Sequence, residues 1–185
     1  MLSDEQCRAF RPLGQRLLVQ RYPLQEQSRG GVMVLGRDFP TMGRIHRLGH
    51  TVSKEFSVYD EIQWTIKPDF DQRCVIGPDW LCLEDDDINV RFDDWGIARA
   101  VGNRVLLSPL SSDKLLTRIS PIIHNDFVLT KWALGNAQSV GAKAKTSIDL
   151  HTDIIYNPSF RSELKLNNYQ YFVVRDEDCI ATVED

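Results

Sequence analysis

The stretch "PLGQRLLVQ", Pro12 to Gln20, decides how this chain is organised, because a close version of it returns as "AVGNRVLLS", Ala100 to Ser108. Each copy contains a Gly-x-Arg step, Gly14 to Arg16 in the first and Gly102 to Arg104 in the second. The offset between these steps is 88 residues, and a run of apolar residues follows each of them. One segment of sequence is therefore present twice.

Two further pairs of segments follow in the same order. "VYDEIQW", Val58 to Trp64, matches "LHTDIIY", Leu150 to Tyr156, with an acidic residue before Ile and an aromatic residue two positions beyond it. "WLCLEDDDI", Trp80 to Ile88, matches "YFVVRDEDC", Tyr171 to Cys179, in which an apolar run ends in an acidic cluster. Their offsets are 92 and 91 residues, so three collinear matches indicate two copies of one module.

A repeat of this length suits a tandem pair of small domains, because it is too long for a solenoid unit. We expect the boundary at "DDWG", Asp93 to Gly96, with a first domain over residues 1–94 and a second over residues 95–185. The apolar runs have the length of strands and are separated by turn residues, and no window shows a long helical stripe. The sequence therefore predicts an all-β chain of two tandem small β-barrels.

Composition and charge exclude several classes of protein. Hydrophobic residues make up 42% of the 185 residues and charged residues 26%, which is typical of a folded globular protein. The net charge of −4 argues against a nucleic-acid partner, which a basic patch would normally bind. No apolar run is long enough to span a membrane, and the first residues lack the order of a secretory signal. We expect a soluble, cytoplasmic protein without a nucleic-acid or membrane partner.

The residues that could carry chemistry do not form a catalytic or metal-binding pattern. The cysteines have no C-x-x-C spacing and the four histidines have no ligand spacing, so we expect no metal and no cofactor. Cys82 and Cys179 are interpreted as small core residues. The acidic runs "EDDD", Glu84 to Asp87, and "RDED", Arg175 to Asp178, fall at the same turn of the repeat and are interpreted as solvated turns.

The stretch "SRGGVMVLG", Ser28 to Gly36, places two glycines before four apolar residues, Val32 to Leu35. It is open to two interpretations, a buried strand entered through a Gly-Gly turn or an exposed apolar hook. Ordering a glycine costs about 0.5 to 1 kcal/mol more than ordering an alanine, which disfavours the strand. The flanks "YPLQEQSRGG" and "GRDFPTMG" are polar and contain proline, as expected of a long excursion between two strands.

Together these motifs resemble the GroES-type co-chaperonins, the ten-kilodalton chaperonin family. "RPLGQRLLVQRY" is similar to the opening strand of that family, "SRGGVMVLG" to its mobile-loop hook and "GRIHRLG", Gly43 to Gly49, to the strand that follows. The second copy follows the closing half of the family from Asp149 to Asp185, but its loop, "SSDKLLTRISPIIHND", lacks the Gly-Gly pair. The resemblance covers about residues 10 to 185. The tandem arrangement is similar to that of the double-length co-chaperonins of plastids, and viruses also encode divergent co-chaperonins.

The resemblance implies two GroES-like barrels, with a mobile loop over about residues 22–41 and a second loop over about residues 111–127. It also implies a co-chaperonin that caps an ATP-driven, GroEL-type chaperonin and assists protein folding, without catalysis of its own. The second loop is either a second hook or a spacer. The residues that the resemblance assigns to chaperonin binding are Gly30, Gly31, Val32, Met33, Val34 and Leu35 in the first loop, and Ile122 and Ile123 in the second.

The resemblance further implies self-association into a ring, through pairing of a first strand with the last strand of a neighbour. "CRAFRPLG", Cys7 to Gly14, and "CIATVED", Cys179 to Asp185, are the expected edge strands. The number of chains in the ring stays open. In the family a roof hairpin lies between the G-x-V-x-x-V-G strand and the V-G-D segment. That gap holds only "HTVSKEFS", His50 to Ser57, in the first copy, but "NAQSVGAKAKTSID", Asn136 to Asp149, in the second. We therefore expect a more open roof above the first copy.

Two other functions compete with the co-chaperonin. The substrate domain of medium-chain alcohol dehydrogenases is also a barrel of this shape, but that enzyme needs a G-x-G-x-x-G turn and zinc ligands, and the sequence has neither. The second is a non-enzymatic interaction protein that keeps the fold, such as a viral assembly factor or a chaperonin inhibitor.

Overall fold

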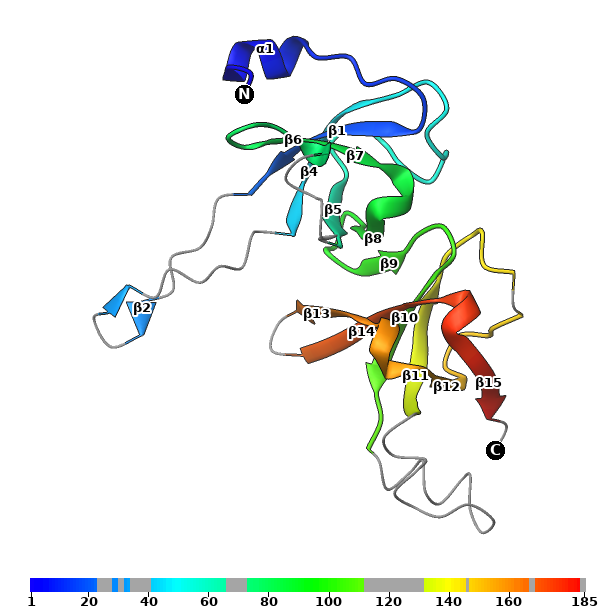
Figure 1. Ribbon diagram of the computed structural model, residues 1–185. Helices are drawn as coiled ribbons and strands as arrows, with labels where there is room; N and C mark the ends of the chain where they lie inside the picture. Colours follow the sequence, from blue (N-terminus) through cyan, green and yellow to red (C-terminus); the bar gives the residue numbers. More distant parts are fainter. Residues whose placement is uncertain are drawn as a thin grey trace. The chain divides into compact units, whose positions relative to one another are not determined.

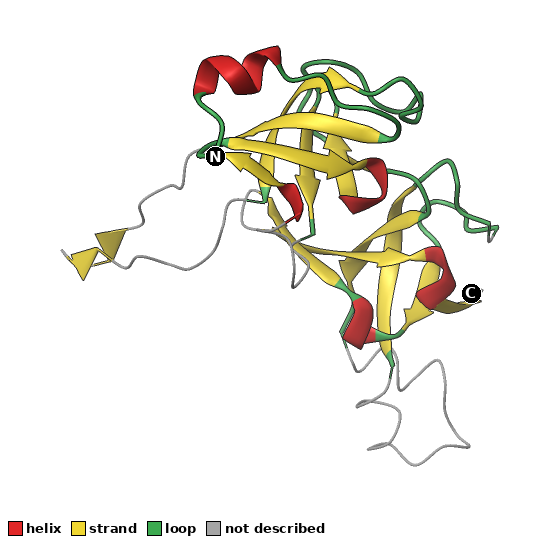
Figure 2. Cartoon of the chain, turned by 45° about the horizontal axis from the view of Figure 1, so that its top comes forward, coloured by secondary structure: helices red, strands yellow, loops and turns green. Residues whose placement is uncertain are grey.

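The computed structural model describes residues 1–22, 28–29, 32–33, 41–65, 73–111, 132–145, 147–166 and 169–183. The chain divides into two compact units, unit 1 over Met1–Gly96 and unit 2 over Ile97–Asp185 (Figure 1). Strands dominate both units, and the helix α1 (Asp4–Ala9) is short (Figure 2).

Unit 1 is an antiparallel sheet in which the strands follow the order β6-β7-β1-β4-β5-β8. Its elements are β1 (Arg16–Arg21), β4 (Met42–Leu48), β5 (Glu61–Trp64), β6 (Val75–Gly77), β7 (Trp80–Glu84), the 3-10 turn η1 (Asp85–Asp87) and β8 (Ile88–Phe92).

Unit 2 has an antiparallel sheet with the order β13-β14-β10-β11-β12-β15, which reproduces the order of unit 1 strand for strand. Its elements are β9 (Ala98–Ala100), β10 (Arg104–Pro109), β11 (Ala133–Val140), β12 (Asp153–Tyr156), the 3-10 turn η2 (Pro158–Phe160), β13 (Ser162–Leu166), β14 (Tyr169–Arg175), the 3-10 turn η3 (Asp176–Asp178) and β15 (Cys179–Val183).

The irregularities of the two sheets also coincide. The β1–β4 ladder shifts register between Leu18 and Val19, and the β10–β11 ladder shifts at the equivalent step, between Leu106 and Leu107. A second shift, between β5 and β8 in unit 1, recurs between β12 and β15 in unit 2. Since bulges are specific features of a backbone and not defects, their repetition supports a common origin of the two units.

The repeated Gly-x-Arg step has a structural reason in both units. Gly14 and Gly102 have positive φ angles of 64° and 59°, a conformation that glycine adopts without strain. A Cβ on Gly49 would lie 2.3 Å from the carbonyl oxygen of Gly14, and one on Gly141 would lie 2.4 Å from that of Gly102. Two backbone segments thus approach each other where only glycine fits.

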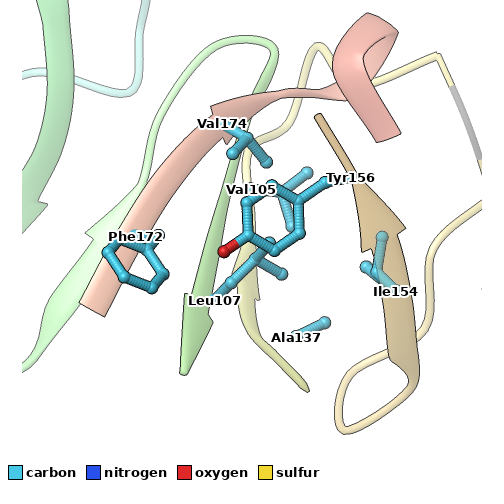
Figure 3. Packing of buried hydrophobic residues seen from close by; sticks show 7 residues of the cluster. All are labelled: Val105, Leu107, Ala137, Ile154, Tyr156, Phe172 and Val174. Carbon is cyan, nitrogen blue, oxygen red and sulfur yellow. The ribbon is translucent and has the colours of Figure 1, made fainter. Parts of the chain in front are cut away.

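Each unit has a hydrophobic core of its own. In unit 2 seven side chains from β10, β11, β12 and β14 gather on one side of the sheet (Figure 3). They are Val105, Leu107, Ala137, Ile154, Tyr156, Phe172 and Val174. The equivalent residues of unit 1 are all buried too: Leu17, Val19, Ile45, Ile62, Trp64, Leu81 and Leu83. Full burial of such side chains contributes about 1.5 to 3 kcal/mol each, so either core is a substantial source of stability.

The prediction of an all-β chain is confirmed. In unit 2 the hydrogen-bonded order starts at β13 and ends at β15 without returning, and in unit 1 it starts at the short strand β6. The sheets are therefore not closed by hydrogen bonds, and the description of each unit as a barrel remains a prediction.

The edge strand predicted over Cys7 to Gly14 is wrong, because α1 occupies its first residues. Ser3 and Gln6 form a capping box, in which the N–H of Gln6 donates to Ser3 Oγ at 3.3 Å and the N–H of Ser3 donates to Gln6 Oε1 at 3.0 Å. Such a box starts a helix, and Ser followed three residues later by Gln is its sequence signature. Trp80 Nε1 donates to Asp4 at 2.7 Å and fastens this helix to the sheet.

The difference expected between the two roof segments is wrong as well. Strand β11 extends to Val140, so that "GNAQSVG", Gly135 to Gly141, is the equivalent of Gly43 to Gly49. The connections that follow, Gly49 to Asp60 and Gly141 to Thr152, span the same number of positions. The later part of β11, from Asn136 onward, has a weak strand signal in the sequence, because small and polar residues stand where strands usually carry branched ones.

Candidate functional site

The predicted hook contains a small hairpin. Strands β2 (Ser28–Arg29) and β3 (Val32–Met33) pair antiparallel, with Ser28 opposite Met33 and Arg29 opposite Val32. They form a two-stranded sheet that is hydrogen-bonded to neither of the larger sheets. The backbone of Val32 and Met33 is therefore not a strand of the unit 1 sheet.

The rest of the predicted binding residues, and the side chains of Val32 and Met33, lie outside the described part of the chain. These residues are Gly30, Gly31, Val34 and Leu35 in the first loop, and Ile122 and Ile123 in the second. Their role in chaperonin binding stays a prediction.

Both predicted loops are inserted at the same point of the repeated fold, after β1 in unit 1 and after β10 in unit 2. The N–H of Tyr22 donates to the carbonyl of Met42 at 3.0 Å, and the N–H of Leu110 donates to that of Leu134 at 3.1 Å. These equivalent bonds bring together the two ends of each insertion. The first insertion carries the β2–β3 hairpin.

The acidic runs fall at the same turn of the repeat, in η1 and η3, but the expectation that they are solvated is only partly correct, because Glu84, Asp86 and Glu177 are exposed while three aspartates are buried. Asp85, Asp87 and Asp176 are only 7%, 2% and 5% exposed. The carboxylate of Asp85 accepts the N–H of Ser53 at 3.3 Å, and that of Asp176 accepts the N–H of Lys145 at 2.6 Å. These aspartates are buried because they bind main-chain N–H groups that would otherwise lack a partner.

The four cysteines are free thiols; Cys7 and Cys74 are buried, while Cys82 and Cys179 are half-buried. Burial, together with Asp176 and Asp178, raises the pKa of Cys179 to about 12, so its thiol is unreactive at neutral pH. Across the described residues no three His, Cys, Asp or Glu side chains come close enough to hold a metal ion. No helix in this part of the chain has the length and apolar character needed to cross a membrane.

No protein-family model matches this chain, and no curated protein matches it either. The similarity to the GroES-type family accordingly depends on the motifs and on their order within the repeat.

The described residues also form a hollow and a side-chain cluster that were not predicted from the sequence. The hollow has a volume of about 260 Å³ and lies beside β15, lined in part by Ile148, Ile154 and Ile180. The cluster consists of Tyr22, Arg44 and Glu61, where the first insertion leaves the sheet. The sequence held one signal of this cluster, because an acidic residue precedes Ile in both copies of the repeat.

Proposed function

We propose that this chain is a tandem co-chaperonin of the GroES type, with two GroES-like barrels, that caps an ATP-driven chaperonin in the cytoplasm, or in the host cytoplasm if it is viral. One observation supports this most. The backbone of Val32 and Met33 belongs to a hairpin separate from the unit 1 sheet, and that hairpin is inserted after the first strand of a duplicated β unit. An apolar segment presented apart from its own sheet is suited to binding elsewhere.

The strength of such a hook is limited. Burying the side chains of Val32, Met33 and Val34 in a partner contributes about 1.5 to 3 kcal/mol each. Association itself costs an estimated 4 to 15 kcal/mol in lost freedom. A single hook therefore binds weakly, and several hooks on one ring bind tightly together because each is held near its site once the first has docked. Weak individual hooks also allow the cap to leave.

Self-association would supply the several hooks. Strand β15 ends the sheet order of unit 2, and its residue Ile180 is 50% exposed beside the hollow described above. An outer strand with unpaired backbone groups is a natural place for another chain to pair. This supports the proposal that copies of the chain join into a ring through β15.

The test is a pull-down with a GroEL-type chaperonin, with and without ATP, followed by refolding of a denatured client. We expect the wild-type chain to be retained only with nucleotide and to support refolding. Met33→Asp places a charge in the hook and should abolish retention. Val58→Asp, at an exposed apolar residue of unit 1 outside the hook, is the matched control and should bind as the wild type does.

The outcomes separate the competing functions. Retention that blocks refolding would favour a chaperonin inhibitor over a cap. Absence of retention, with the protein folded, would overturn chaperonin binding altogether and favour an interaction protein with another partner.

A further inference from the structure

A shared carboxylate oxygen joins three strands at the base of the first insertion. The hydroxyl of Tyr22, directly after β1, donates to Glu61 Oε1 on β5. Arg44 Nη2, on β4 between them, donates to the same oxygen at 2.9 Å. The side chain of Tyr22 is thereby tied across β4 to the next strand of the sheet.

Two main-chain hydrogen bonds lie at the same place. The N–H of Tyr22 donates to the carbonyl of Met42, and the N–H of Trp64 donates to that of Thr41, each at 3.0 Å. Tyr22 is the last described residue before residues 23–27, and Thr41 is the first described one after residues 34–40. The side-chain cluster therefore holds Tyr22, where the chain leaves the sheet, and main-chain hydrogen bonds hold Thr41 and Met42, where the chain returns.

The charges of the cluster fit this role at neutral pH. The hydrogen bond from Tyr22, and then the one from Arg44, lowers the pKa of Glu61, so its carboxylate stays ionised. Burial, and then the hydrogen bond to Glu61, raises the pKa of Tyr22, so its phenol keeps the proton that it donates. The Arg44 and Glu61 side chains are 52% and 42% exposed, and an ion pair this exposed contributes only about 0 to 1 kcal/mol. We therefore attribute the fixed geometry of the cluster mainly to the hydrogen bond from the Tyr22 phenol to Glu61.

Unit 2 lacks this arrangement. The positions of Tyr22, Arg44 and Glu61 are taken there by Leu110, Asn136 and Asp153. Asn136 Nδ2 donates to Asp153 Oδ1 at 2.7 Å, which keeps the contact between β11 and β12. Leu110 has no hydroxyl, so its side chain cannot make the third bond. The two insertions thus differ at their bases although the backbone around them is the same.

We propose that Tyr22, Arg44 and Glu61 are positioning residues that set the direction in which residues 23–40 leave the sheet, and that they make unit 1 the principal binding arm. This inference rests on the proposed function. A segment whose base is already fixed loses less freedom when it docks, and so it retains more of its binding free energy. Unit 2, in which the uncharged Asn136 replaces Arg44 and no phenol is present, provides the secondary arm.

The experiment compares nucleotide-dependent binding to a GroEL-type chaperonin for four variants of unit 1 and one of unit 2. Tyr22→Phe keeps the ring but removes the donor, and should weaken binding about three- to tenfold, as expected for one lost hydrogen bond. Glu61→Leu removes the acceptor of the bonds from both Tyr22 and Arg44, and should weaken binding at least as much. The double variant should be no weaker than Glu61→Leu alone, since the bond from Tyr22 is already absent there. Tyr59→Phe, at an exposed tyrosine of unit 1, is the matched control and should bind as the wild type does.

A second readout does not need the chaperonin. Hydrogen exchange at the N–H of Tyr22 should be faster in Tyr22→Phe than in the wild type and unchanged in Tyr59→Phe. If the wild type fails to bind, the proposed function fails, and this exchange still decides whether the cluster fixes the base of the insertion. Unchanged exchange, or unchanged affinity in a chain that does bind, overturns the role of Tyr22. Asn136→Ala should leave affinity nearly unchanged, and a loss equal to that of Tyr22→Phe would overturn the primacy of unit 1.

Discussion

His151 lies 92 residues after Tyr59, and both residues hold a left-handed backbone, with φ angles of 67° and 78°. Their N–H groups donate to equivalent carbonyls, of Ala137 at 2.7 Å and of Ile45 at 2.8 Å. A residue with a Cβ pays roughly 1 to 2 kcal/mol for this conformation. Since both units keep it at one position of the repeat, the strained turn is a feature of the repeated backbone.

This strain predicts an unusual order of stability at position 59. Tyr59→Gly should be more stable to unfolding than Tyr59→Ala by about 1 kcal/mol, because only glycine escapes the penalty for positive φ. At Val58, an exposed neighbour without positive φ, the order should reverse, with glycine about 0.4 to 1 kcal/mol less stable than alanine. Urea unfolding of the four variants measures this. If the alanine variant were the more stable one at both positions, the positive φ at Tyr59 would carry no energetic penalty.

The close approach of Gly49 to Gly14 predicts a large effect of a single methyl group. Gly49→Ala places a carbon 2.3 Å from a carbonyl oxygen, and the backbone must move to accept it. We expect a loss of about 3 kcal/mol in the free energy of unfolding, as for strongly overpacked sites. The control is Gly96→Ala, since no atom lies within 4 Å of a Cβ there. It should cost about 1 kcal/mol for its positive φ alone. Equal losses in the two variants would contradict the close contact.

From the packing and burial of His46 we predict that the folded protein loses stability in mild acid. Its ring packs edge-on against Trp80, with centroids 5.1 Å apart. Burial, then the charges of Arg47 and Arg8, lowers the pKa of His46 below 6.5, against a smaller opposing effect of Asp4. The folded state therefore favours the neutral imidazole, and its contribution to stability is complete above pH 6.5 and falls as the pH drops below that value.

The variant that checks this is His46→Gln, because glutamine occupies the equivalent position, Gln138, in unit 2. Urea unfolding at about pH 7.5 and about pH 5.5 brackets the titration of an ordinary histidine. The wild type should lose more stability than the variant between these two conditions. An identical loss in both proteins would assign the pH dependence to other groups.

From the raised pKa of Cys179 we predict that its thiol reacts slowly with alkylating agents. With a pKa of about 12, its thiolate population at pH 8 is on the order of a thousandfold below that of an ordinary thiol. Iodoacetamide should modify Cys179 far more slowly in the native protein than in concentrated urea, as followed by mass spectrometry of the peptide. Comparable rates in the two conditions would mean that the thiol is accessible and its neighbours do not suppress ionisation.

The sequence anticipated the elements in which both copies carry branched apolar residues. "RLLVQRY" and "RVLLSPL" are β1 and β10, and their apolar residues are the centres of the two cores. It failed at "GNAQSVG", where Ala137 and Ser139 fill inward positions of β11 without a strong strand signal. It also passed over β8 and β13, although Ile88, Val90 and Phe92 alternate with polar residues in β8, and Leu164 and Leu166 do so in β13.

The candidate site was anticipated less completely. The Gly-Gly pair before Val32 predicts an exposed hook, and the hairpin of Val32 and Met33 lies outside the unit 1 sheet, while binding through it stays a prediction. The contact of Tyr22 with Glu61 could not be foreseen, because it joins residues 39 positions apart whose meeting depends on the order of β1, β4 and β5.

By itself the sequence determined that one segment is repeated and that the chain is rich in strands, since these properties follow from the order and the periodicity of the residues. Only the tertiary structure decided which strands pair, that three aspartates of the acidic turns are buried, and that the side chains of Tyr22 and Arg44 share one oxygen atom of Glu61. The physical reason is that hydrogen bonds and burial depend on distances between strands remote in sequence, which the packing of the whole sheet fixes.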